Sequence, residues 1–417
     1  MHKISPFFSI IIPTRNRADT LYYSIKTVLN QNFSDYELII CDNNSTCETA
    51  KIVADFNNDK IKYIKSEKDL AMSDNWELAL SKASGRYNII FGDDDGIMPY
   101  ALSELFIIIN KTGAKLIKWD RIFYNWPTII VKEVANLTTV PLGSSFRYVD
   151  SYKLIRKVIK NKLGYEYLPM FYNSAVHKDL IAKAKKKAGR VFYATQPDIY
   201  SGYLFAHLSK KTLIIQKPMT INGGSANSSG SAINTKKFQE RIDAFNSLYT
   251  NSLITFNKSI PQVRSVSGYI IEPFLQLKKI YPEITYNIKR KKIITAIANN
   301  LQVLDIEEWN ASRNIIASSI KNNKKLNRWF QKYWEKLGIK IIRKYEKSNN
   351  PVLCGETITI DASNFNITNV YEISVFVSSL LKGYNLDDKE VDRLIKEAKS
   401  LKRIIKNIIK YNKIFII

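Results

Sequence analysis

Short apolar runs alternate with segments of helical periodicity over the first 110 residues of the chain. The apolar runs contain few charges, and we expect them to form strands at residues 8–12, 36–41, 61–64 and 87–91. Between them, apolar residues recur every third or fourth position, which predicts helices at residues 17–30, 45–56 and 73–83 and a further helix opening at Pro99. Strands that alternate with helices at this spacing predict an α/β fold with a mostly parallel sheet.

Polar residues follow three of these strands at the point where each strand ends. They are the segments 13–17 (PTRNR), 42–45 (DNNS) and 92–96 (GDDDG). Ligands of parallel α/β sheets bind at the carboxyl ends of the strands, so we expect these segments to converge on one edge. Three adjacent carboxylates repel one another unless a cation lies among them. Mg²⁺ takes oxygen ligands and usually shares them with substrate phosphates.

As an ordered set, these motifs resemble those of family 2 glycosyltransferases. The resemblance is carried by residues 9–14, 42–45, 72–77 (MSDNWE), 91–95 (FGDDD) and Pro99. It is strong over residues 7–110, weak over 111–230 and absent beyond.

The resemblance implies an inverting transferase of the GT-A fold that uses a nucleotide-diphospho-sugar and a divalent cation, Mg²⁺ or Mn²⁺. It assigns residues to the nucleotide and diphosphate (Pro13, Thr14, Arg15 and Arg17), to the base and ribose (Asp42 and Asn43) and to the donor in general (Asn75 and Trp76). For Asn75 and Trp76, helix capping and packing are an equal alternative. Many relatives have two acids where this chain has Asp42-Asn43; an amide can still pair with a pyrimidine edge, so we expect a UDP-sugar.

The same resemblance matches the triplet Asp93, Asp94 and Asp95 to the metal-binding Asp-x-Asp motif. Counted back from Pro99, the first acid of the commonest relatives falls at Gly92, so the register within the triplet stays open. We favour Asp95 as the ligand, with Asp94 on the ribose or the metal.

Inverting transfer to a hydroxyl group also needs one general base on the acceptor side. Residues 134–230 contain four acids, Asp150, Glu166, Asp179 and Asp198. Asp150 and Asp179 stand at expected helix starts, where capping accounts for them. Relatives carry an acidic pair or a Pro-Asp leading into a helix at the place of Asp198. By that similarity we predict that Asp198 is the base, a role compatible with capping.

Composition and charge indicate the cellular compartment of the protein and the kind of partner that it binds. The formal net charge is +25 in 417 residues, which favours an anionic partner. The chain has three cysteines and no C-x-x-C pair, as is typical of a reducing compartment. It shows neither a signal sequence nor an apolar run long enough to span a bilayer. We therefore expect a cytoplasmic protein, or one peripheral to the inner face of the cell membrane.

The one stretch rich in Gly, Ser and Asn, residues 221–232, predicts a boundary between two domains. We expect a GT-A transferase domain over residues 1–230 and a basic, mainly helical domain over 231–417. The expected C-terminal helices cover residues 269–277, 291–303 and 307–320, with Pro273 as a kink or start of the first.

The last 25 residues have the pattern of a cationic amphipathic helix. Residues 393–417 contain eight basic side chains and one acidic side chain, Glu397. Their apolar stripe consists of Leu394, Ala398, Leu401, Ile405 and Ile408, with Ile404 and Ile409 beside it. Residues 390–417 could therefore lie on an anionic membrane surface, or the stripe could pack on the protein itself. The membrane interpretation agrees with the resemblance, because many such enzymes act on polyprenyl-linked acceptors.

We interpret the chain as a metal-dependent glycosyltransferase that transfers a sugar to a hydroxyl of a glycan or lipid-linked acceptor, in surface polysaccharide biosynthesis. Two alternatives remain: a basic nucleic-acid-binding protein, suggested by the charge and by the aromatic residues of the basic segment 321–347, and an inactive GT-A scaffold. The first leaves the carboxylate triplet unexplained. A dinucleotide-binding oxidoreductase would need a G-x-G-x-x-G turn where this chain has Pro13 to Asn16.

Overall fold

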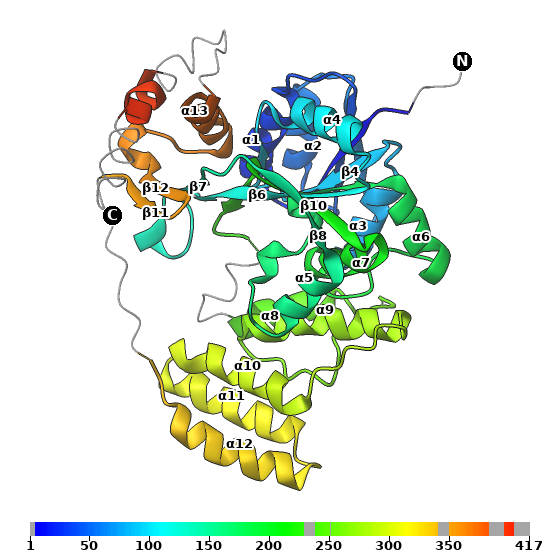
Figure 1. Cartoon of the computed structure of the whole chain (residues 1–417), viewed down its shortest axis with the longest axis vertical. Helices are drawn as coiled ribbons and strands as arrows, with labels where there is room; N and C mark the ends of the chain where they lie inside the picture. The colour runs from blue at the N-terminus through cyan, green and yellow to red at the C-terminus, as the bar shows by residue number, and fades with distance from the viewer. Residues whose placement is uncertain (1–4, 229–237, 251, 341–349, 383–395, 404–417) are drawn as a thin grey trace.

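A computed structural model describes residues 5–228, 238–250, 252–340, 350–382 and 396–403 (Figure 1). Its centre is one mixed sheet of twelve strands with helices on both faces. One face packs on α1, α4 and α13, and the other on α3, α5, α6 and α7. This confirms the predicted α/β class.

The N-terminal strands are parallel, as their sequence predicts. β1 pairs in parallel with β2 and β4, and β2 with β3. Every residue of β2 and β4 is buried, as expected for a parallel strand covered on both faces. The elements of this part are β1 (Phe8–Thr14), α1 (Ala18–Leu29), β2 (Tyr36–Asp42), α2 (Cys47–Asp55), β3 (Ile61–Lys65), α3 (Met72–Ser81), β4 (Tyr87–Ile90) and α4 (Ala101–Thr112).

The middle of the chain makes the sheet mixed. β6 and β10 are parallel to each other, whereas β9 runs antiparallel between β4 and β6. β5, β7 and β8 also pair in the antiparallel sense. The strands here are β5 (Gly96–Ile97), β6 (Leu116–Asn125), β7 (Leu137–Pro141), β8 (Phe146–Asp150), β9 (Ser174–His177) and β10 (Lys211–Gly224). The helices are α5 (Ser151–Ile159), α6 (Lys178–Ala188), α7 (Pro197–Ser209) and α8 (Phe238–Ser247). Parallel pairing is thus confined to β1–β4 and to the β6–β10 pair.

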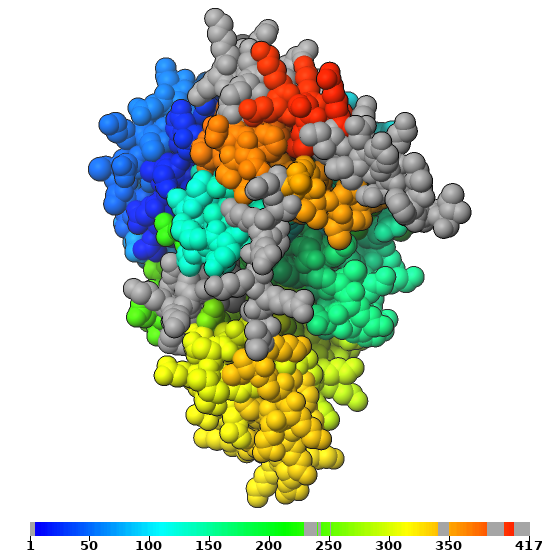
Figure 2. Space-filling view, turned by 90° about the vertical axis from the view of Figure 1, so that its left-hand side faces the viewer, coloured from blue at the N-terminus to red at the C-terminus, as the bar shows by residue number. Residues whose placement is uncertain are grey.

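The chain returns to the sheet near its C-terminal end. β11 (Val352–Cys354) and β12 (Thr357–Asp361) extend the sheet antiparallel to β7, and α13 (Val370–Lys382) packs beside α1. Figure 2 shows these orange residues against the dark blue N-terminal segment. The segment expected as one domain, 231–417, is therefore divided between the sheet core and a separate helical cluster. The predicted boundary near 230 stays a prediction.

The helical cluster consists of α9 (Val266–Ile280), α10 (Arg290–Asn300), α11 (Ile306–Ser319) and α12 (Lys324–Leu337), of which α10–α12 project from one end of the molecule (Figures 1 and 2). Pro273 lies inside α9. Two aromatic residues of the basic segment, Phe330 and Trp334, are buried, and the Trp334 ring lies 3.9 Å from that of Trp309. These rings stabilise the cluster by packing, which leaves less aromatic surface for a nucleic acid.

Part of the C-terminal amphipathic stripe packs on the protein. Ala398 and Leu401 are buried in the core that contains α1 and α13. The other members of the stripe, Leu394, Ile404, Ile405, Ile408 and Ile409, lie outside the described residues. Within the described ranges, no helix is both long and apolar enough to cross a membrane.

Glu272, in the middle of α9, makes stability depend on pH. Its Oε1 accepts from the backbone N–H of Asn257 and from Gln276, whereas its Oε2 is buried with no partner among the described residues. Burial raises the pKa of this carboxyl from 4.5 to about 7. The folded state therefore holds the proton more tightly than the unfolded state, and stability is lost as the pH rises from about 4.5 to about 7.

We expect Glu272→Gln, which mimics the protonated form, to raise the free energy of unfolding at pH 8 by up to about 3 kcal/mol and to change it much less at pH 5. Urea unfolding at the two pH values measures the difference. The control is Glu335→Gln on the exposed face of α12. An equal effect of Glu272→Gln at both pH values would contradict this account.

Candidate functional site

A buried ion pair joins the loops that follow β1 and β4. Thr14 Oγ1 donates to Asp93 Oδ2 at 2.7 Å, and Arg17 Nη1 donates to Asp93 Oδ1 at 2.8 Å. The same Arg17 nitrogen lies 3.4 Å from Asp94 Oδ2. The structure thus brings together two of the predicted segments, 13–17 and 92–96, at the carboxyl edge of the sheet.

The charges in this ion pair change one another's pKa. Burial by itself lowers the pKa of Arg17, but Asp93 and Asp94 offset this effect, so the pKa is raised overall. Burial and the charge of Asp94 raise the pKa of Asp93, while Arg17 and Thr14 act in the opposite direction. Arg17 therefore stays charged and holds the acidic loop against β1.

Asp95 is bound by the end of strand β10. Its Oδ1 accepts from the Gly223 N–H at 2.7 Å and from Asn222 Nδ2 at 3.1 Å, and its Oδ2 accepts from the Gly92 N–H at 2.8 Å. Burial and the charge of Asp94 raise the pKa of Asp95, and these three N–H donors counteract the rise. Oδ1 of Asp95 thus joins the acidic loop to β10, and Oδ2 closes a hydrogen bond within the loop.

Asp94 has contacts that are easier to exchange. Its Oδ2 accepts from the hydroxyls of Ser225, at 2.6 Å, and Ser228, and its Oδ1 has no partner among the residues that the structure describes. The backbone of β10 approaches closely here, because a Cβ on Gly223 would lie 1.8 Å from the Asp94 carbonyl oxygen. That carbonyl accepts from Trp126 Nε1 at 2.9 Å, which fixes the Asp94 backbone.

The donor chemistry of the triplet fits Mg²⁺ or Mn²⁺, because it offers only oxygen atoms. Among the described residues, no three His, Cys, Asp or Glu side chains converge as a complete metal cage. Mg²⁺ is commonly held by one or two carboxylates together with substrate phosphates, so a cage is not required. Asp94 fits this role better than Asp95, since the oxygens of Asp95 already accept N–H bonds. The assignment of Asp95 as ligand stays a prediction.

The loop after β2 is tied to the segment near residue 70. Asp42 accepts from the Ser45 N–H at 2.8 Å and from the Tyr63 hydroxyl at 2.5 Å. Asn43 exchanges two hydrogen bonds with the backbone of Leu70. Both side chains are buried at the expected edge, and these contacts hold the loop in shape.

Arg15 and Pro13 are more accessible than Thr14 between them. Arg15 Nη2 lies 2.5 Å from Asp69 Oδ2, and the two side chains are 35% and 44% exposed. Pro13 is half-buried at the end of β1. An exposed ion pair contributes little to stability, so Arg15 can exchange Asp69 for another anion at small cost.

Asn75 and Trp76 lie in the core behind this edge. Asn75 Oδ1 is 3.3 Å from Cys41 Sγ, and Trp76 packs edge-on against Tyr172 and Phe192. Their observed contacts match the packing alternative. Donor binding by these two residues stays a prediction.

Tyr172 is a site residue that the sequence analysis missed. Burial and the negative charges of Asp198 and the acidic triplet raise the pKa of its hydroxyl. Tyr172 is thus close enough to the predicted base and to the acidic triplet to be influenced by both. It stands in a short 3₁₀ segment, Phe171–Asn173, and no motif distinguishes it in the sequence.

Asp198 stands in the first turn of α7, after Pro197. The cap position is Gln196, so Asp198 does not cap the helix, whereas Asp150 caps α5 by accepting from the Lys153 N–H at 2.8 Å. Asp198 Oδ1 is buried and has no hydrogen-bond partner within the part of the chain that the structure describes. Burial raises the pKa of Asp198, and the Ile199 N–H and the charge of Arg121 counteract the rise. A carboxylate with an unpaired oxygen and a raised pKa can accept a proton.

The other acids in that region have contacts of their own. Asp179 forms an exposed ion pair with Lys115 at 2.6 Å, and it does not cap α6 with its side chain, because His177 does. Glu166 lies in the 3₁₀ segment Tyr165–Tyr167.

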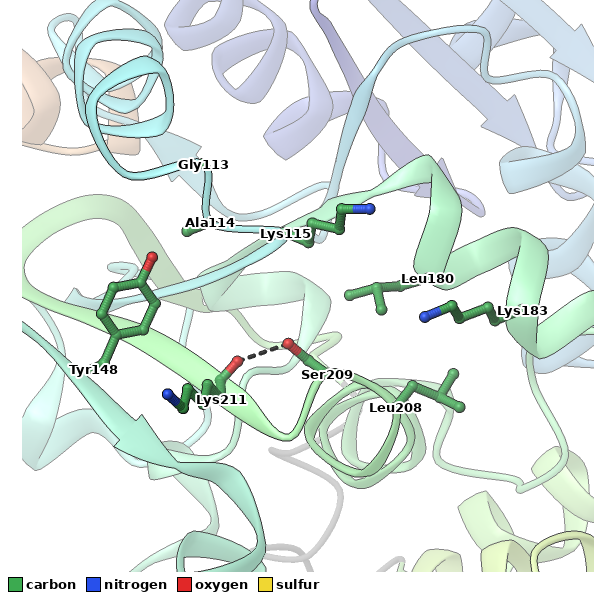
Figure 3. Close-up of a pocket in the computed structure, with 9 residues that line it drawn as sticks. All are labelled: Gly113, Ala114, Lys115, Tyr148, Leu180, Lys183, Leu208, Ser209 and Lys211. Carbon is green, nitrogen blue, oxygen red and sulfur yellow. Dashed lines mark hydrogen bonds between the residues drawn. The ribbon is translucent and has the colours of Figure 1, made fainter.

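A pocket of about 240 Å³ lies away from these residues (Figure 3). Its lining includes Lys115, Lys183 and Lys211, and Ser209 Oγ donates to the Lys211 carbonyl at 2.6 Å. Lys211 begins β10, whereas Asn222 and Gly223 end it, so the pocket is at the opposite edge of the sheet. No carboxylate lines it.

Comparison with known proteins gives one family and several partial relatives. The glycosyl transferase family 2 model matches residues 9–174. The chain is 36% identical over 109 residues to the GalNAc(5)-diNAcBac-PP-undecaprenol beta-1,3-glucosyltransferase of Campylobacter jejuni, covering 25% of this chain and 35% of that protein. It is 37% identical over 89 residues to the UDP-Glc:alpha-D-GlcNAc-diphosphoundecaprenol beta-1,3-glucosyltransferase WfgD of Escherichia coli, covering 21% and 35%. The matches thus span about a third of these relatives' length.

Among solved structures, residues 1–349 of TarS from S. aureus in complex with UDP are similar at a TM-score of 0.43 and 13% identity, covering 84% of this chain and 94% of that chain.

The Arg17–Asp93 pair gives a stability test of the site. We expect Arg17→Gln to lower the free energy of unfolding by about 3–5 kcal/mol, because it leaves two buried carboxylates without their cation. The double variant Arg17→Gln/Asp93→Asn should recover part of that loss. Urea unfolding of both variants measures it.

The matched control is Arg15→Gln, which breaks an exposed ion pair and should change stability by less than about 1 kcal/mol. Equal effects of the two arginine variants would show that the Arg17 pair does not hold the loops together.

Proposed function

We propose that this chain, whose residues 9–174 match the glycosyl transferase family 2 model, transfers a sugar from a UDP-sugar to a hydroxyl group of a lipid-linked glycan. The observation that carries the proposal is the convergence of Thr14, Arg17 and Asp93 at the carboxyl edge of the sheet, with Asp198 close enough to Tyr172 to influence it. An anionic leaving group and an acceptor hydroxyl need two neighbouring sites, one that holds a divalent cation and one that holds a base.

Two groups would bind the diphosphate of the donor. Arg15 can release the exposed Asp69 and form forked hydrogen bonds to a phosphate. Asp94 would hold Mg²⁺ or Mn²⁺, which supplies positive charge to the leaving diphosphate when bound. Arg17 already forms an ion pair with Asp93, so its proposed role is to position the acidic loop.

Asp198 would remove the proton of the acceptor hydroxyl. Its unpaired Oδ1 is the acceptor atom for that proton, and burial keeps its pKa above the ordinary carboxylate range. As the hydroxyl oxygen bonds to the anomeric carbon, the bond from that carbon to the diphosphate breaks, which inverts the configuration. The Tyr172 ring forms the wall between the two half-sites.

The relatives' names support the choice of substrates. WfgD is named for UDP-Glc and for a diphosphoundecaprenol acceptor. We extend that chemistry to this chain as a UDP-sugar donor and a polyprenyl-diphosphate-linked acceptor, used in polysaccharide biosynthesis. An acceptor of this kind is reached at the cytoplasmic face of the membrane, where the basic residues 390–417 would contact anionic lipid.

The proposal is tested by a screen of nucleotide-sugars with the full chain. Release of UDP is measured with Mg²⁺, with Mn²⁺ and with EDTA. We expect turnover of at least one UDP-sugar, and loss of that turnover in EDTA. No turnover of any nucleotide-sugar, with or without a lipid-linked acceptor, would favour the inactive scaffold.

We expect Asp198→Asn to lower kcat by at least about 100-fold while UDP binding is retained, because only the proton acceptor is removed. In the wild type, kcat/KM should fall as the pH drops below the raised pKa of Asp198, since the protonated acid cannot act as a base. Single-turnover kinetics and UDP calorimetry measure the two properties. Asp179→Asn, at an exposed ion pair, is the control. An active Asp198→Asn variant would assign the base to another residue.

A further inference from the structure

Arg121, on strand β6, is a buried cation without an anionic partner. Arg121 is 7% exposed, and its side chain makes no hydrogen bond or ion pair with any residue that the structure describes. Its guanidinium carbon lies 5.2 Å from the centroid of the Phe123 ring. Other buried cations are paired, such as Arg17 with Asp93 and Lys118 with Asp120.

An unpaired buried charge lowers stability, and arginine cannot escape this cost by losing its proton. Among the described residues, several side-chain nitrogen and oxygen atoms are fully buried without a hydrogen-bond partner, and none of them belongs to Arg121. The guanidinium of Arg121 therefore keeps some access to solvent. The Arg121 guanidinium is therefore available to bind an anion that comes from outside the chain.

Arg121 lies beside the predicted base. Its charge acts on Asp198, Tyr165 and Lys118, and helix α7 contacts strand β6. No ion pair forms between Arg121 and Asp198. The two side chains are therefore near each other without forming an ion pair.

Two exposed aromatic rings lie beside Arg121 and Lys118. Phe123 is 42% exposed beside Arg121, and Tyr167 is 43% exposed with Lys118 Nζ 5.3 Å from its ring centroid. Such rings offer apolar faces on which the C–H groups of a sugar can pack. Aromatic surface, a buried arginine and a carboxylate base are together suited to an acidic saccharide.

We infer that Arg121, Phe123 and Tyr167 form the acceptor subsite, and that Arg121 binds an anionic group of the acceptor. This group is a phosphate of a lipid diphosphate or the carboxylate of an acidic sugar. The inference rests on the proposed function, because it places the acceptor beside Asp198. The guanidinium would form forked hydrogen bonds to either oxyanion and so bring the neighbouring hydroxyl toward the base.

The test compares three acceptors with the full chain and its active UDP-sugar. They are a farnesyl-diphosphate-linked sugar, the octyl glycoside of the same sugar, and an octyl glucuronide. We expect Arg121→Gln to lose about 10- to 100-fold more kcat/KM on an anionic acceptor than on the neutral glycoside, as for loss of a charged hydrogen bond. Arg121→Lys should lose less. Arg328→Gln, on the exposed face of α12, controls for the loss of one positive charge.

The outcomes separate the two proposals. A selective loss on the diphosphate or on the glucuronide identifies which anion is bound. Equal losses on all acceptors overturn the anion subsite and leave the transferase intact. If the wild type turns over no UDP-sugar, the proposed function fails, and the subsite is judged by binding alone. In that case, farnesyl diphosphate added with saturating UDP should raise the Tm of the wild type and not that of Arg121→Gln; equal shifts overturn the inference.

Discussion

The site depends on one buried interaction, that of Arg17 with Asp93. The acidic loop after β4 would otherwise place adjacent carboxylates in a setting from which water is largely excluded. Arg17 offsets this repulsion, and Thr14 adds a hydrogen bond from the same loop. Because Arg17 is paired with carboxylates of the chain itself, other cationic residues have to bind the substrate. The exposed Arg15 and the unpaired Arg121 are the residues whose surroundings leave them free to do so.

Strand β10 supplies the second support of the acidic loop. Its end donates to Asp95 through Asn222 and Gly223, while Ser225 reaches Asp94. The segment 222–225 therefore binds two of the three carboxylates. Asp94 Oδ2 accepts from hydroxyl groups and lies 3.4 Å from Arg17 Nη1, while its Oδ1 has no partner among the residues that the structure describes. Asp93 and Asp95 thus have partners on both oxygens, whereas Asp94 has one oxygen left for a ligand.

The sequence predicts the parts of this arrangement that arise locally. The apolar runs of β1–β4 and the rule for parallel sheets place Thr14 and Asp93 at the same edge, as observed. The contacts made by β10 depend on pairing with residues more than 100 positions away, such as Asn222 with Asp95, and no local pattern encodes them. Tyr172 was missed for the same reason. The short strands β11 and β12 were also missed, because their few residues gain order only by pairing with β7.

Burial limits what the net charge says about where this chain binds. The net charge of +25 favours an anionic partner, yet the aromatic residues Phe330 and Trp334 of a basic segment pack inward, and Ala398 and Leu401 of another pack on the sheet domain. Exposed lysines on such segments are solvated and contribute weakly to any specific contact. A single guanidinium that is largely buried, as at Arg121, interacts more strongly with an anion than a solvated ammonium group does. Specific recognition by this molecule is therefore expected where cations are buried, beside the carboxylates, rather than where they are most numerous.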